Sequence, residues 1–299
     1  MCKPTDSRKH TLLLTTKSFE SSSNDGTDVQ PTVLSTWMTI GAIILVLIAI
    51  EQSLRFLFFS VMHTHPILEN ETNRQILARH IGIDTVCCTI VAYLGMKNIH
   101  VCQDIISHVL HGKNSMPMAG FEKRLFTYFP ASQQIALVFF SYQVKNMYDT
   151  IVWNDGIEFV LHHIFAGAAA YGAMYPGVAH FYAVFFLGIS EISTAILCVL
   201  ANFDETHGVV GLAEAFPTAR IVIAVLFVIA FICCRTVMWP FFGYHFMKDS
   251  LVALKSNRSW TIKAYLRMLL AIFGGLTVLQ IIWLGQIIVM ARQEILKLI

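Results

Sequence analysis

The chain has 299 residues, of which 56% are hydrophobic and only 13% charged, and its mean hydropathy is +0.61. Soluble domains carry about 25% charged residues, so this composition argues against a cytosolic globular enzyme. The net charge of +2 comes without a long basic run, which argues against nucleic-acid binding, and the 12% aromatic content excludes disorder except at the ends. The class that remains is a membrane-embedded protein.

The chain begins with a polar segment and continues with apolar ones. Residues 1–32 are rich in Ser, Thr, Asp and Lys without apolar periodicity, which predicts a flexible tail and not a signal peptide. Residues 33–292 are predicted to form the membrane domain, and residues 293–299 a short C-terminal tail. Segments long enough to cross about 30 Å of hydrocarbon as helices lie near residues 34–60, 77–97, 125–152, 157–175, 178–202, 219–246 and 266–291. The predicted fold class is an all-α, polytopic membrane protein with about seven transmembrane helices.

Local features refine this arrangement. The third segment is interrupted by polar residues such as Lys145 and Asp149, so we expect it to face other helices. The sequence Tyr175-Pro176-Gly177 predicts a tight turn between the fourth and fifth segments. Residues 98–111 have the apolar spacing of an interfacial helix. Six cysteines lie in or beside apolar segments without metal-binding spacing, and we expect free thiols.

Lysine and arginine are distributed unevenly between the predicted loops. Under the positive-inside rule, this asymmetry predicts a cytosolic N-terminus. The tail and the even-numbered loops hold Lys3, Arg8, Lys9, Lys17, Lys97, Lys113, Lys123, Arg124, Lys248, Lys255, Arg258 and Lys263, whereas the opposite side holds Arg74, Arg220, Arg292 and Lys297, with Arg79 at a helix edge.

Ionisable side chains at membrane depth are costly and therefore mark candidate functional sites. Asp155, Glu158 and His162 have the spacing i, i+3 and i+7, which predicts one shared helical face, while His163 points about 100° away. A histidine held by a carboxylate can act as a general base or a nucleophile.

The fifth and sixth segments supply further polar side chains. Glu191 has Ser190 and Thr194 close by, and Arg235 lies near the centre of the sixth segment, where it could bind a phosphate or an acyl carboxylate. Because a tight turn joins the fourth and fifth segments, these groups can face one intramembrane cavity.

A purely structural role stays open for each of these groups. His162, His163, Glu191 and Arg235 could form an interhelical network that fixes packing. Glu51 with Arg55, and Lys145 with Asp149, have the i, i+4 spacing of self-satisfying ion pairs. No metal site is predicted, since His100, His108 and His111 lack a compact set of carboxylates or thiols.

These residues resemble those of the TLC-domain family, which includes the ceramide synthases and the ceroid-lipofuscinosis ER protein. The resemblance covers residues 35–292 and is closest to the small TLC-domain-containing proteins. It is carried by Asp149, the pair His162 and His163, the stretch Ser190-Glu191-Ile192-Ser193-Thr194, and Arg235 followed by Pro240.

The resemblance implies a protein of the endoplasmic reticulum or another intracellular membrane that acts on or senses lipids. The expected function is lipid homeostasis, with Asp149, Asp155, Glu158, Ser190, Thr194 and Arg235 at a lipid-binding cavity. The alternative is acyl-CoA-dependent N-acylation of a lipid, with catalytic His162, His163 and Glu191. The ceramide synthases carry several acidic residues after the histidine pair, whereas Glu191 is the only carboxylate here between His163 and Asp204, which weakens the alternative.

Membrane lipids are the expected partners, and a homo-oligomer or a complex with another membrane protein stays open. No nucleic-acid partner is expected. No cofactor is expected, with acyl-CoA as co-substrate only for an acyltransferase.

Overall fold

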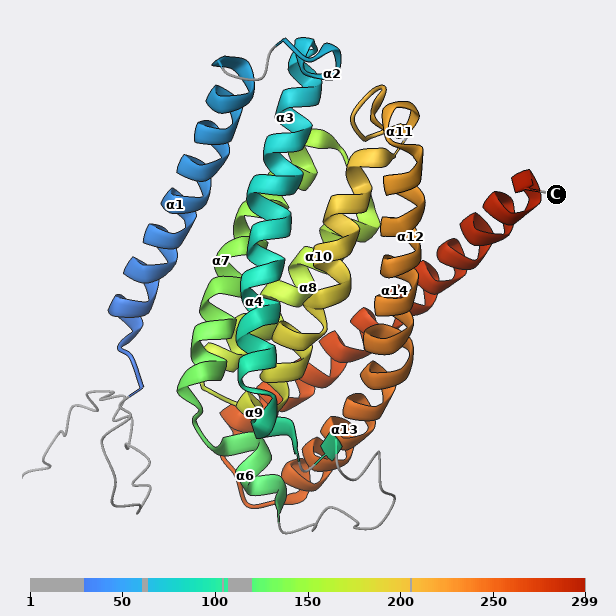
Figure 1. The fold of residues 1–299 in the computed structure, drawn as a ribbon. Helices are drawn as coiled ribbons and strands as arrows, with labels where there is room; N and C mark the ends of the chain where they lie inside the picture. The colour runs from blue at the N-terminus through green and yellow to red at the C-terminus, as the bar shows by residue number, and fades with distance from the viewer. Residues whose placement is uncertain (1–29, 61–63, 104, 107–119, 205, 299) are drawn as a thin grey trace, which may run out of the picture.

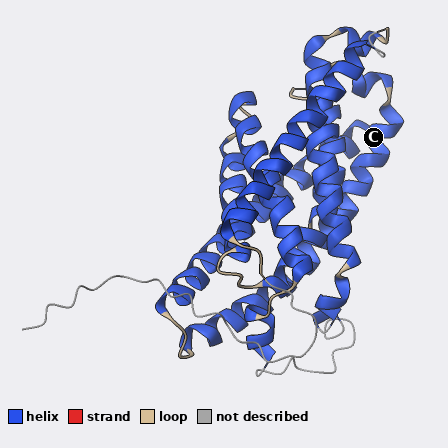
Figure 2. Ribbon diagram, turned by 90° about the vertical axis from the view of Figure 1, so that its left-hand side faces the viewer, coloured by secondary structure: helices blue, strands red, loops and turns tan. Residues whose placement is uncertain are grey.

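The structure is a computed structural model that describes residues 30–60, 64–103, 105–106, 120–204 and 206–298. In this part of the chain every regular element is helical, and the helices form one elongated bundle (Figures 1 and 2). The predicted all-α fold is therefore confirmed. Most of the predicted polar tail and much of the predicted interfacial helix over residues 98–111 lie outside the described residues.

Within the described residues, five helical stretches are long and apolar enough to cross a membrane. Two are nearly continuous single helices, and three combine α-helices with short π-helical or 3₁₀ segments. They are α1 (Val33–Ser60); α3 (Glu71–Arg79), η1 (His80–Thr85) and α4 (Val86–Lys97); α9 (His180–Ala183), η4 (Val184–Ile189), α10 (Glu191–Leu200) and η5 (Ala201–Phe203); α12 (Pro217–Phe231), η6 (Ile232–Met238) and α13 (Trp239–Lys255); and α14 (Trp260–Leu298).

The third and fourth predicted segments are also helical, as α7 (Pro130–Trp153) and α8 (Ile157–Met174). They are not among the five apolar spans, because α7 is rich in buried polar residues and the short α8 carries Glu158, His162 and His163. They pack along each other inside the bundle. The expectation that the third segment faces other helices is thus confirmed.

Several boundaries differ from the predictions. The segment predicted over 125–152 is split into α6 (Phe121–Phe126) and α7, because Pro130 begins a new helix. The sixth span continues to Lys255, and α14 continues to Leu298 over most of the predicted C-terminal tail. Short elements α2 (Pro66–Glu69), η2 (Ile99–Cys102) and α11 (Leu212–Ala215) connect the longer ones. The tight turn predicted at residues 175–177 is confirmed, and its Gly177 has φ +81°.

A close glycine contact fixes the crossing of α4 and η4. A Cβ atom added at Gly95 would lie 2.6 Å from the backbone nitrogen of Ile189, and one added at Gly188 would lie 2.9 Å from the Cα of Gly95. Only two glycines permit this approach, which brings the start of α10 against the middle of the bundle.

Large apolar side chains are exposed on the outer helices, as expected for a surface that faces lipid. α1 exposes residues such as Leu34, Leu45 and Phe56, and α12 exposes Ile221 and Val225. In Figure 1, α1 lies at the edge of the bundle, and the C-terminal part of α14 projects beyond it. The described cysteines Cys87, Cys88, Cys102, Cys198, Cys233 and Cys234 are free thiols, as predicted.

Candidate intramembrane site

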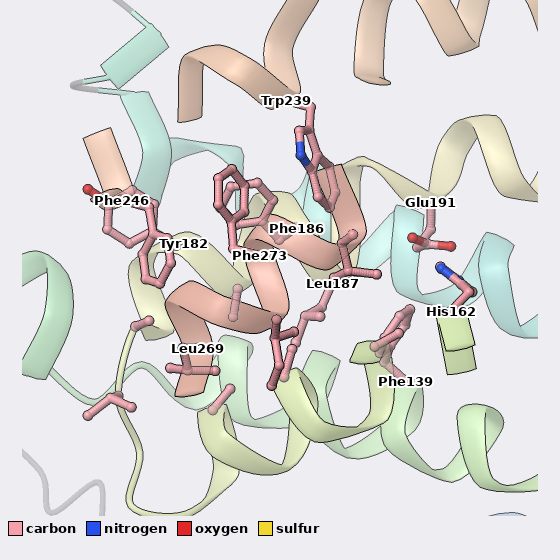
Figure 3. A pocket seen from close by; sticks show the side chains of 18 of the residues that line it. Phe139, His162, Tyr182, Phe186, Leu187, Glu191, Trp239, Phe246, Leu269 and Phe273 are labelled. Atoms are coloured by element: carbon pink, nitrogen blue, oxygen red, sulfur yellow. The ribbon is translucent and has the colours of Figure 1, made fainter. Parts of the chain in front are cut away.

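A cavity that opens on one side lies between helices of the bundle, and about 660 Å³ of space free of atoms, part of it outside the protein, lies between its lining residues. In Figure 3, His162 and Glu191 lie at one end of the cavity, and Tyr182 and Phe246 lie at the other. The lining residues are Phe139, His162, Ala166, Ala169, Ala173, Val178, Ala179, Tyr182, Ala183, Phe186, Leu187, Glu191, Arg235, Trp239, Phe246, Leu269, Ile272, Phe273 and Leu276.

The cavity is long, and its walls are apolar. Between His162 and Ala173, α8 contributes alanines to the lining over about 16 Å of helix axis. The walls from η4, α13 and α14 carry aromatic rings, among them Phe186, Trp239 and Phe273. Small side chains on one helix and flat rings on the others leave an elongated space that suits a hydrocarbon chain.

Arg235 and Glu191 form the polar end of this cavity. Nη2 of Arg235 donates to Oε1 of Glu191 at 2.7 Å and to the Thr194 hydroxyl at 3.0 Å, while Nε donates to Ser193 Oγ at 3.2 Å. The side chains of Arg235 and Glu191 are only 5% and 3% exposed, so both charges are removed from solvent. No residue in the described part of the chain accepts a hydrogen bond from Nη1 of Arg235.

Pi-helical segments place this ion pair. η4 ends at Ile189, directly before Ser190 and Glu191, and η6 contains Arg235. A π-turn inserts an extra residue into a helix, shifts the faces that follow it, and occurs frequently at functional sites. The third such segment, η1, contains the buried Asp84.

The adjacent histidines point in different directions, as their helical spacing predicted. Nδ1 of His163 lies 2.6 Å from Oε1 of Gln143 on α7, and His163 does not line the cavity. His162 does line it, and its buried Nδ1 has no hydrogen-bond partner among the described residues. Its ring lies 5.3 Å from that of Trp283 on α14. Of the pair, only His162 is therefore positioned for chemistry in the cavity.

The predicted face of Asp155, Glu158 and His162 does not form. α8 begins only at Ile157, after a loop in which Asn154 and Gly156 have positive φ angles, so Asp155 lies outside the helix. Its carboxylate pairs with Arg79. Glu158 lies in the first turn of α8 and, like Asp155, does not line the cavity.

Asp149 belongs to a separate buried ion network. The expected pairs of Glu51 with Arg55, at 2.5 Å, and of Lys145 with Asp149 are both present. Lys145 also reaches Glu51 at 2.8 Å, which joins α1 to α7. This network therefore has the structural role that the i, i+4 spacing indicated, and Asp149 does not line the cavity.

The hydroxyl groups beside Glu191 have different roles. Ser190 Oγ donates to the Phe186 carbonyl at 2.8 Å, so its hydroxyl is hydrogen-bonded to the preceding turn of its own helix. Thr194 reaches the polar end of the cavity indirectly, by accepting from Arg235.

The sequence did not indicate a second buried pair at the opposite end of the cavity. Nε and Nη2 of Arg124 donate to the two oxygens of Asp249 at 2.5 and 2.6 Å, and the hydroxyl of Tyr182 also donates to Asp249 at 2.5 Å. Arg124, expected to be a loop charge, is buried and only 7% exposed. In the sequence, Asp249 is an acidic residue within the helix α13, and its position there does not identify Arg124 or Tyr182 as its partner.

In the part of the chain that the structure describes, no group of three or more His, Cys, Asp or Glu side chains could hold a metal ion. The chemistry available in the cavity is therefore that of one imidazole and one buried Arg–Glu pair.

The fold and the site define an α-helical, multi-pass membrane protein with an amphipathic intramembrane cavity. The family model of the TLC domain matches residues 78–289, and the chain belongs to the TLC-domain family. This family is linked to lipid metabolism or sensing. No curated protein and no solved structure matches the chain significantly.

Proposed function

We propose that this protein binds a single-chain lipid in its intramembrane cavity and acts in lipid homeostasis by transporting or sensing that lipid. The observation that carries the proposal is the distribution of polarity. The lining is apolar over most of its length, its charged and imidazole side chains His162, Glu191 and Arg235 lie at one end, and at the other end the Tyr182 hydroxyl is turned to Asp249. An acyl chain with one polar head has the same distribution.

The proposal is tested by extracting lipids from the purified protein and identifying them by mass spectrometry. Ala169→Trp fills the middle of the cavity, so we expect loss of the co-purified lipid. Ala42→Trp is the matched control, because Ala42 is exposed on α1, and it should retain the lipid. Wild-type protein without bound lipid, or equal lipid in the wild type and Ala169→Trp, would contradict the proposal.

A second candidate function is acyl transfer from acyl-CoA to a lipid amine. The observation that favours it is the unpartnered Nδ1 of His162, in a ring that faces Glu191 (Figure 3). As a general base, His162 would take a proton from the amine while the nitrogen attacks the thioester carbonyl. The C–S bond would break, and CoA would leave as the thiol after receiving that proton.

The structure makes this alternative specific to one histidine. With acyl-CoA and a sphingoid base, His162→Ala should abolish amide formation, whereas His163→Gln should retain much of it because His163 contacts Gln143. Full product formation by purified His162→Ala would exclude His162 as the base. Absence of product from the wild type would leave lipid binding as the function.

A further inference from the structure

Gln280 on α14 is a buried polar residue that neither the family motif nor the ion network uses. Gln280 is 5% exposed, and both Nε2 and Oε1 of its side chain are buried without a hydrogen-bond partner among the described residues. A buried donor or acceptor without a hydrogen bond destabilises the fold by about 1–3 kcal/mol. The buried amide of Gln280 therefore calls for a hydrogen-bond partner.

The position of Gln280 on α14 places it at the level of the polar end. Leu276, four residues earlier, lines the cavity, and Trp283, three residues later, packs against the ring of His162. Residues with these spacings share one face of a helix. Gln280 does not itself line the cavity; it lies one turn beyond Leu276, on the side of α14 that carries the lining residues and the ring packed against His162.

The charges at this end limit the ligand. Among the residues that line the cavity, only Glu191 and Arg235 carry full charges, and they neutralise each other at 2.7 Å. A carboxylate or phosphate head would bring an uncompensated charge into a site with no free counter-charge, which costs several kcal/mol. An uncharged head would meet donors and acceptors instead.

We propose that Gln280 completes the polar end of the cavity and that the ligand is a neutral single-chain amphiphile whose hydroxyl or amide head both donates and accepts hydrogen bonds. The amide of Gln280 offers one acceptor and one donor group, Nη1 of Arg235 offers a further donor, and His162 offers Nδ1. This inference rests on the proposed lipid binding and specifies the chemistry of the head.

The test compares monooleoylglycerol with oleate, which share one acyl chain, in equilibrium binding to the full-length protein in detergent. We expect the neutral lipid to bind at least about tenfold more tightly. Oleate binding should strengthen as the pH is lowered, because the protonated acid is neutral, whereas monooleoylglycerol binding should not change. Equal or tighter binding of oleate would overturn the neutral-head inference and leave lipid binding itself intact, whereas failure of both lipids to bind would overturn the proposed function as well.

Gln280→Met keeps the size of the side chain and removes the amide. We expect monooleoylglycerol affinity to fall by about tenfold or more, while the melting temperature of the ligand-free protein stays equal or rises. Gln280→Leu is the second variant, and Gln286→Met is the control because Gln286 is exposed on the same helix. Unchanged affinity in folded Gln280→Met or Gln280→Leu would exclude Gln280 from the site, and a lower melting temperature in both variants would show a structural role instead.

Discussion

Breaking the pair of Arg235 and Glu191 is the sharpest test of the site, because the pair holds the polar end of the cavity together. Glu191→Gln removes the negative charge with little change in shape and leaves Arg235 charged and 5% exposed, with the hydroxyls of Ser193 and Thr194 and the ring of Trp239 as its other contacts. Removing one partner of a buried ion pair typically costs about 3–5 kcal/mol of unfolding free energy. At roughly 2–4 °C per kcal/mol, the melting temperature in detergent should fall by roughly 6–20 °C.

The double variant Arg235→Met with Glu191→Leu separates the pair from its surroundings. Because both charges are removed, its stability should lie within about 1–2 kcal/mol of the wild type, far from the sum of the two single losses. Glu122→Gln is the control, since Glu122 pairs with Arg258 but is 43% exposed, and its loss should be at most about 1 kcal/mol. Additive losses in the double variant, or a single-variant loss as small as that of Glu122→Gln, would refute the account of the pair.

Three other substitutions or measurements test separate parts of the structure. Gly95→Ala should cost about 1–3 kcal/mol because its Cβ would meet the backbone of η4, whereas Gly41→Ala should be nearly neutral because nothing lies within 4 Å of its Cβ; equal melting temperatures would refute the glycine crossing. Asp249→Asn should cost about 3–5 kcal/mol by leaving Arg124 unpaired, and a loss below about 1 kcal/mol would contradict the buried pair. An epitope tag at residue 1 should be accessible after selective permeabilisation of the plasma membrane, and its protection would reverse the predicted orientation.

The membrane fold could be predicted because apolar length is a local property of the sequence. Helices cover most of each of the seven predicted segments, five of these lie in stretches long and apolar enough to span a membrane, and the turn at residues 175–177 lies where it was expected. The starts of α7 and α8 could be predicted less well. α7 begins at Pro130. α8 begins after the positive φ angles at Asn154 and Gly156, and these angles depend on packing as well as on the local sequence.

The site could be predicted only in part. His162, Glu191 and Arg235 stood out as ionisable groups in apolar segments, and they converge on one cavity. Which of two adjacent histidines faces that cavity depends on helix rotation. The sequence does not single out Gln280, because one amide hardly interrupts an apolar segment, and its significance arises from its burial without a partner among the described residues.

The π-helical segments explain why the spacing of the polar residues was not sufficient. η4 and η6 shift the residues that follow them relative to a regular helix, so the approach of Arg235 to Glu191 depends on three-dimensional packing. Tyr182 and Asp249 illustrate the same limit, since they lie 67 residues apart and meet only in the folded chain.

The central claim is that an acyl chain occupies the cavity with its head beside Arg235, and photolabelling tests it most directly. A monoacylglycerol that carries a diazirine at the end of its chain can be cross-linked to the purified protein and mapped by peptide mass spectrometry. The account predicts labels at the end of the cavity lined by Tyr182 and Phe246, and their loss in Ala169→Trp. Labels confined to the lipid-facing residues of α1 and α12 would contradict it.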